Sequence, residues 1–335
     1  MKRSIFGLVS LLFLAACQSE VAPVDPSQNK IPLAPHCIGR TTIDLPVGAI
    51  LNWSQEVEIF AVDRDGSSSR EKFEEEIEAR KSQLKAMPHD TEGSRLSDFQ
   101  KIRDGLALII FRDSEVSTYI YKVEAYYWPG PWGYKLSGEV ASESRAELQS
   151  LPALADNIKV FQGPDSSEDH GFCIDGGYIE GAPTRLSVNV TGRIRNWQSS
   201  SFWVGAFEGE NGPEDEAAEI DHELKREKDA AKDVSLADPE ATKDPAFPKS
   251  FVALRHGDRA LAGLSGKELV WRKELSGGSV AYRFRWQAKT GLDSGVAVGL
   301  DIGDETGTRS APSEHDMFAL WDAMLPSLSV KRKTR

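Results

Sequence analysis

The 335-residue chain is poor in the residues and motifs from which most active sites are built. It has only three cysteines and six histidines, and it contains no G-x-S-x-G elbow, Walker loop or H-E-x-x-H motif. The histidines are scattered, and none lies next to a pair of carboxylates at a spacing that argues for acid-base work: His36, His89, His170, His222, His256 and His315. The sequence therefore predicts no catalytic site, no metal site and no cofactor.

Positive charge is also in short supply. The chain has 40 Lys and Arg against 52 Asp and Glu, a formal net charge of −12. A protein with this balance does not favour the phosphate backbone of nucleic acids. Nucleic-acid binding is therefore excluded from the expected functions, whereas a basic protein partner would be attracted.

Long hydrophobic runs are absent except at the start of the chain. Lys2 and Arg3 precede an apolar run, Ile5 to Ala16, which is too short to span a bilayer and is typical of a secretory signal. The ending "LAAC" is similar to a bacterial lipobox, in which Cys17 is acylated and becomes the mature N-terminus. The alternative is an ordinary signal peptide cleaved near Ala16.

The lipobox interpretation predicts the location of the protein. Residues 1–16 would be the lipoprotein signal peptide and residues 17–34 a polar, proline-bearing tether between the lipid and the folded domains. Gln18 rather than Asp follows Cys17, and by the usual sorting rule this favours the outer membrane. We therefore expect a periplasmic protein held at the membrane by its lipid.

The two remaining cysteines, Cys37 and Cys173, would lie in an oxidising compartment. Two cysteines there are expected to form a disulfide, which would close a loop of 136 residues. The chain-entropy treatment of such a loop gives a stabilisation of about 5 kcal/mol as an upper bound. The alternative is a pair of buried free thiols that act as small apolar residues.

The order of expected elements occurs twice along the chain. "HCIGRTTIDLP" and "FCIDGGYIEG" each open a run of alternating strands, followed by a helix, further strands and a final helix. This predicts an α+β protein of two related domains, each a mainly antiparallel sheet with two helices. The expected domains are residues 35–162 and 171–330, joined by a linker at 163–170. Two unrelated α+β domains remain the alternative.

Individual segments are predicted from their patterns. In the first half we expect a helix over 67–87, a tight turn at Asp104-Gly105, and a helix over 144–161 interrupted by Pro152. In the second half, the expected strands after the long acidic helix are 251–258, 259–266, 268–275, 279–289 and 295–303.

Two segments have the composition of a binding surface. "YYWPGPWGY" offers Trp128 and Trp132 as possible anchors, since such residues dominate interface energetics; the alternative is that they cover the core of their own sheet. Residues 208–221 contain seven acidic and no basic residues. The expected contacts there are Glu208, Glu210, Glu214 and Asp215, which could meet a basic partner, and the alternative is a helix start that favours solubility.

These features together resemble a known family. A lipobox leader, then "HCIGRTTIDLPVGA", then "FCIDGGYI" at the start of a second half, is similar to the two-domain immunity lipoproteins of type VI secretion. The resemblance implies a non-enzymatic protein that binds a cognate lipase (phospholipase) effector in the periplasm and blocks its active site or the movement of its lid. It supplies no contact motif that can be carried onto numbered residues.

Other functions remain open at this point. The runner-up is an envelope lipoprotein that binds a small molecule or supports an envelope assembly, and a weaker option is a hydrolase with a dispersed site. The identity of the partner and the oligomeric state of the free protein do not follow from the sequence.

Overall fold

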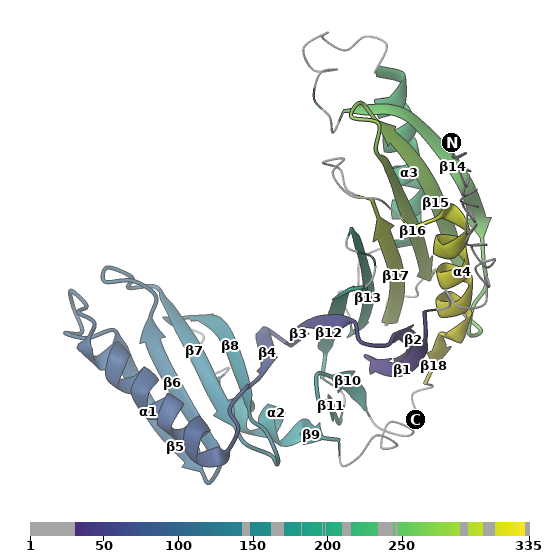
Figure 1. Ribbon diagram of the computed structural model, residues 1–335. Coiled ribbons are helices and arrows are strands. Elements are labelled where there is room, and N and C mark those ends of the chain that lie inside the picture. Colours follow the sequence, from purple (N-terminus) through teal and green to yellow (C-terminus); the bar gives the residue numbers. More distant parts are fainter. Residues whose placement is uncertain are drawn as a thin grey trace, which may run out of the picture. The chain divides into compact units, whose positions relative to one another are not determined.

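A computed structural model describes most of the chain after the predicted leader (Figure 1). The described residues are 31–142, 148–161, 171–181, 183–195, 197, 199–209, 216–233, 244, 247–288, 294–303 and 312–331. Cys17, most of the predicted tether and the whole predicted linker lie outside them. Residues 31–335 form one compact unit. No described helix is both long and apolar enough to cross a membrane.

The described elements follow the same order in the two halves of the chain. The first half contains β1 (Leu33–Ile38), β2 (Thr41–Pro46), β3 (Ile50–Val57), β4 (Phe60–Arg64), α1 (Arg70–Ala86), β5 (Leu96–Arg103), β6 (Leu106–Arg112), β7 (Ile120–Tyr127), β8 (Tyr134–Ala141), α2 (Leu151–Asn157) and β9 (Ile158–Val160). The second half contains β10 (Phe172–Ile174), β11 (Gly177–Ile179), β12 (Arg185–Arg193), β13 (Ser200–Gly209), α3 (Glu216–Asp233), β14 (Pro248–Asp258), β15 (Gly266–Leu275), β16 (Val280–Ala288), β17 (Ser294–Ile302), α4 (Glu314–Met324), a 3-10 turn (Leu325–Ser327) and β18 (Ser329–Val330). Each half is thus four strands, a helix, four strands, a helix and a last strand.

The main sheet shows the same repetition in space. Its twelve strands run in the order β14-β15-β16-β17-β13-β12-β3-β4-β8-β7-β6-β5, and all neighbours are antiparallel. Strands that hold the same place in the two halves occupy mirrored positions in this order. The two halves therefore meet at the centre of the sheet, where β3 pairs with β12.

The last strand of each half pairs with the other half. β9 adds to the β10-β11 hairpin of the second half, and β18 adds to the β1-β2 hairpin of the first. These two three-stranded sheets pack with α2 and α4 against the apolar face of the main sheet, in a core that includes Phe202, Phe284, Trp286 and Trp321. Each half therefore completes its structure with a strand that the other half provides.

The helix α1 forms where its end signals and its apolar spacing predict it. The Ser69 hydroxyl accepts a hydrogen bond from the Lys72 backbone N–H at 3.4 Å and caps the N-terminus, and Pro88 follows the C-terminal end. Phe73, Ile77 and Leu84 share one face and are buried against the sheet.

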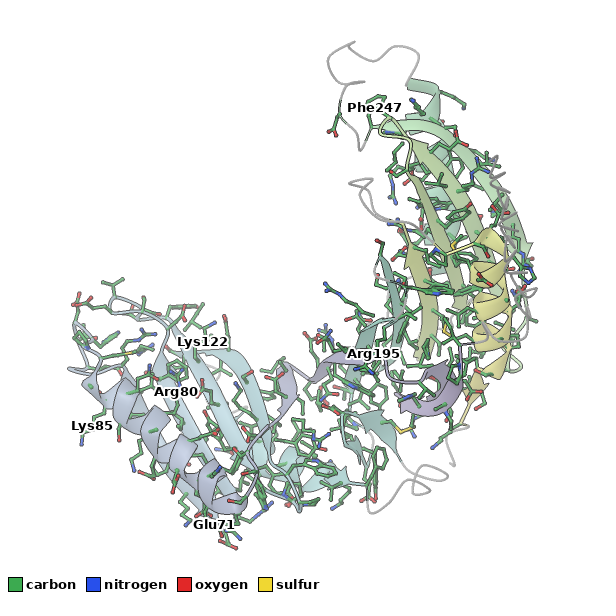
Figure 2. The ribbon with its side chains drawn as sticks, viewed as in Figure 1. Glu71, Arg80, Lys85, Lys122, Arg195 and Phe247 are labelled. Atoms are coloured by element: carbon green, nitrogen blue, oxygen red, sulfur yellow. A yellow bond between two sulfur atoms is a disulfide. The ribbon has the colours of Figure 1, made fainter. Side chains whose placement is uncertain are left out.

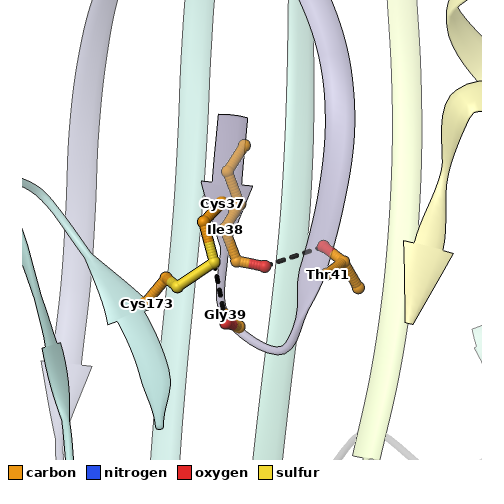
Figure 3. The surroundings of a disulfide bond; sticks show 5 residues. All are labelled: Cys37, Ile38, Gly39, Thr41 and Cys173. Atoms are coloured by element: carbon orange, nitrogen blue, oxygen red, sulfur yellow. Dashed lines mark hydrogen bonds between the residues drawn. A yellow bond between two sulfur atoms is a disulfide. The ribbon is translucent and has the colours of Figure 1, made fainter. Parts of the chain in front are cut away.

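A disulfide joins the starts of the two halves (Figure 3). Cys37 in β1 and Cys173 in β10 have their Cα atoms 5.8 Å apart. Gly39 and Cys173 also exchange two backbone hydrogen bonds, with N···O distances of 3.0 and 2.8 Å. Gly39 has φ +58°, and a Cβ atom there would lie 2.6 Å from the Cβ of Ala206. The crosslink is thus set within a backbone contact that only glycine permits.

The sequence-based expectations of the fold are largely confirmed. The α+β class, the two related antiparallel halves with two helices each, the helix near 67–87, the Asp104-Gly105 turn and the disulfide are all present. The predicted helix over 144–161 is wrong at its end: α2 covers Leu151–Asn157, with Pro152 in its first turn, and residues 158–160 form β9.

A second correction concerns the predicted strand 259–266. The chain reverses there, with Leu261 and Leu264 bridged and positive φ at Ala262 and Gly263, as in a type I′ turn. The apolar residues of this segment therefore belong to a turn between β14 and β15.

Gly39→Ala is expected to destabilise the protein more than Gly48→Ala. Both glycines have positive φ, so alanine costs about 1 kcal/mol at each, but only at Gly39 does the new methyl group meet a neighbour within 4 Å. The clash should add about 1–3 kcal/mol. Urea unfolding of the two variants and the parent measures this difference, and equal losses would contradict the close packing at Gly39.

Candidate partner-binding surface

The two predicted tryptophan anchors are packed against their own chain. The Trp128 ring lies 5.1 Å from that of Phe73 in α1, centroid to centroid. The Trp132 Nε1–H donates to the Tyr134 hydroxyl at 3.1 Å, and the Arg64 guanidinium lies 4.2 Å above its ring. Both side chains are half-buried. These contacts favour the alternative that the rings cover the protein's own sheet.

Glu208 is an interior residue of β13. Its side chain points to the same face as Phe202, Val204 and Ala206, is 8% exposed, and accepts a hydrogen bond from Arg40 Nε at 2.6 Å. The sequence of β13 predicts that Glu208 is buried, because it continues the series of buried residues at every second position of the strand. Glu210, Glu214 and Asp215 lie outside the described residues.

The two long helices cover the two ends of one face of the main sheet. α1 packs on Ala107, Ile109 and Phe111 of β6, where Figure 2 shows Arg80 between the helix and β7, bonded to Glu124 at 3.0 and 2.9 Å. α3 packs on Leu269 and Trp271 of β15. Following the paired residues from strand to strand places both helices on the same face, because directly paired residues point to the same side.

The central strands on this face form a regular grid of side chains that remain accessible. We call these nine residues the open face, and in three cross-strand rows they are Ile50, Arg193 and Ser201; Asn52, Thr191 and Trp203; and Ser54, Asn189 and Gly205. Ile50 is 70% exposed and Trp203 is half-buried. The opposite faces of the same strands are buried in the core.

The composition of the open face differs from that of the whole chain. Arg193 is its only charged residue, whereas charged residues make up 27% of the protein. Depletion of charged groups together with Trp and Arg is typical of the central part of a protein–protein interface. Sequence analysis missed this surface because β12 and β3, which align its rows, are distant in the chain.

Trp203 lies on a platform of glycines. A Cβ at Gly299, its cross-strand neighbour on β17, would come within 2.2 Å of the indole Nε1, and Gly205 lies beside the same ring. The guanidinium of Arg285, which is paired with Gly299 on the next strand β16, lies 5.0 Å from the ring centroid. Burial lowers the pKa of Arg285, while Asp301 acts in the opposite direction. The indole is therefore held in one position on the sheet.

The described residues offer no centre for metal chemistry. They include no group of three or more His, Cys, Asp or Glu side chains that could hold an ion. Of the histidines, His89 is buried and bonded to the Ser117 carbonyl at 2.8 Å, and His256 pairs with Asp221 at 3.0 Å. Both histidines thus have contacts that account for their positions.

The fold and the surface define a class: a two-domain α+β protein with an accessible sheet face suited to binding another macromolecule. The family models for the N-terminal and C-terminal domains of Tle cognate immunity protein 4 match residues 34–162 and 167–333. The chain belongs to this family of immunity proteins. A third model, for the lipid attachment site of prokaryotic membrane lipoproteins, matches residues 1–18. The protein is thus a lipid-anchored periplasmic member of the family.

Solved structures share the fold. A structure described as the Tle4-Tli4 complex aligns with a TM-score of 0.73 and 18% identity, covering 90% of this chain and 98% of the other. The apo immunity protein TplEi of the type VI secretion system of Pseudomonas aeruginosa aligns with a TM-score of 0.72 and 19% identity, with the same coverage. The same protein with the "L" peptide gives 0.68 and 16%, covering 89% and 98%. No curated protein sequence matches the chain.

Glu208→Ala is expected to destabilise the fold by about 3 kcal/mol, because it leaves Arg40 without its carboxylate in a largely buried place. Glu56→Ala is the matched control, since Glu56 and Arg185 form an exposed pair at 3.7 Å, which contributes about 0–1 kcal/mol. Chemical unfolding of both variants measures the difference. A Glu208→Ala protein as stable as the control would contradict the interior role of Glu208.

Proposed function

We propose that the protein is an immunity protein that binds a cognate type VI secretion lipase effector in the periplasm and inhibits it. Membership of the Tle cognate immunity protein 4 family carries this proposal. Inhibition would be steric: the bound protein covers the active site of the lipase or prevents its lid from moving.

The open face is the surface we assign to this interaction. It is accessible, nearly free of charge, and contains a positioned tryptophan, as interface centres do. Helices α1 and α3, which cover the two ends of the same face, offer further contacts at the rim. The protein would act by binding in a one-to-one complex and would itself catalyse no reaction.

The lipid would hold the inhibitor where the effector arrives. Acylation of Cys17 leaves a tether of about 16 residues before β1, which starts at Leu33. Gln18 after the lipidated cysteine supports the outer membrane as the destination. A lipase that reaches the periplasm would then meet its inhibitor at the membrane surface.

The first test is binding and inhibition by the protein without its leader. The lipase effector encoded beside this protein should co-purify with residues 18–335 and lose activity on phospholipid vesicles at an equimolar ratio. The expected stoichiometry is one to one by light scattering. Absence of both a complex and inhibition would contradict the proposed function, and it would favour the small-molecule or assembly role of the runner-up.

The second test concerns the anchor. Cys17→Ser should leave the protein without lipid, so the variant should no longer be found in the detergent-extracted membrane fraction. The parent should sediment with the outer membrane in a density gradient. A parent protein in the inner-membrane fraction would contradict the outer-membrane assignment, and an unchanged Cys17→Ser protein would contradict lipidation at Cys17.

A further inference from the structure

We propose that Trp203 is the anchor of the open face, and that it contacts an apolar side chain of the effector while Arg193 of the open face and Arg195, which follows β12, pair with effector carboxylates. This inference rests on the proposed function and gives the partner's surface its chemistry: an apolar side chain with acidic neighbours.

The first argument is the position of the indole. Trp203 would lose its place if β17 carried a side chain at Gly299, because a Cβ there would collide with the indole. A large ring held in one orientation loses little conformational entropy when a partner covers it. Trp203 is half-buried before binding, so its upper surface is what remains for a partner to bury.

The second argument is the unused hydrogen-bonding capacity of Trp203. Within the described part of the chain, its indole N–H has no hydrogen-bond partner, unlike the indoles of Trp132, Trp271, Trp286 and Trp321. Tryptophan combines a large apolar area with one donor, which is why it is frequent at interface centres.

The third argument is the charge at the C-terminal end of β12. Arg193 and Arg195 are exposed and make no ion pair with any described residue, and Figure 2 labels Arg195 just after β12. By contrast Arg185 pairs with Glu56, and Arg285 with Asp301 at 3.3 Å. Since the open face contains no acidic residue, the carboxylates that complement Arg193 and Arg195 have to come from the partner.

The same charge pattern argues against a second copy of this chain as the occupant. A two-fold dimer through the open face would bring identical surfaces together. Arg193 would then face the same nine residues, none of which is acidic, and the flanking carboxylates of Glu56 and Asp301 already pair with Arg185 and Arg283. The effector is therefore the occupant we assign.

The experiment measures the Kd of the parent and of single variants for the effector by calorimetry. Trp203→Ala should weaken binding by about 30-fold or more, the usual loss for a hot-spot residue. Gly299→Ala should weaken binding too, because it displaces the indole without removing it. Tyr119→Ala is the matched control: Tyr119 is a 64% exposed aromatic residue outside the open face, and its truncation should leave the Kd unchanged.

The arginines are tested in the same assay. Arg193→Glu should weaken binding by about 10-fold or more and reduce the dependence of the Kd on salt, while Arg193→Lys should stay within a few-fold of the parent. Thermal unfolding of each variant shows whether the fold is retained. If Trp203→Ala does not fold, the single variants Gly299→Ala and Arg193→Glu still test the inference.

The outcomes separate the two proposals. A parent that does not bind the effector would overturn the proposed function. A parent that binds, together with folded Trp203→Ala and Arg193→Glu variants of unchanged Kd, would overturn this inference and leave the immunity function standing. Self-association of the parent that Trp203→Ala abolishes would also overturn it, in favour of a second copy as the occupant.

Discussion

The antiparallel ladder between β3 and β12 is the contact on which the rest of the structure depends. Among the described strands it is the only pairing that joins the two six-strand parts of the main sheet, and it runs from Leu186 opposite Val57 to Arg193 opposite Ile50. The Cys37–Cys173 disulfide and the exchanged strands β9 and β18 lie on the apolar side of the same junction. Neither half completes its sheets alone, so we expect the two halves to fold as one cooperative unit.

This junction also produces the surface to which we assign function. Because equivalent strands meet at the centre, the equivalent helices α1 and α3 cover the two ends of the same face, and neither helix covers the middle, which is the open face on β3, β12 and β13. Burial on the opposite face holds these strands in place. The open face is thus rigid before any partner arrives, and a preorganised surface loses less entropy on binding than a flexible one.

Much of the fold follows from local patterns, and the site does not. The repeated order of strands and helices, the cap at Ser69 and the glycine turn at Asp104-Gly105 are encoded in neighbouring residues. The open face is a non-local property, because Trp203 acquires its setting from Gly299 and from the β12 ladder. The tryptophans that stood out in sequence, Trp128 and Trp132, did so because aromatic residues cluster there, and clustering does not distinguish a core from a surface.

The same limit applies to the acidic segment. Its first residue, Glu208, lies in the interior. The alternation of buried residues along β13 predicts this position, whereas the acidic composition of the segment suggests an exposed one.

The most direct test of the account is equilibrium unfolding in urea of the protein without its leader, followed by tryptophan fluorescence and by far-UV circular dichroism. A shared junction predicts one transition with coincident midpoints for both signals. Two separate transitions, one for each half, would contradict it.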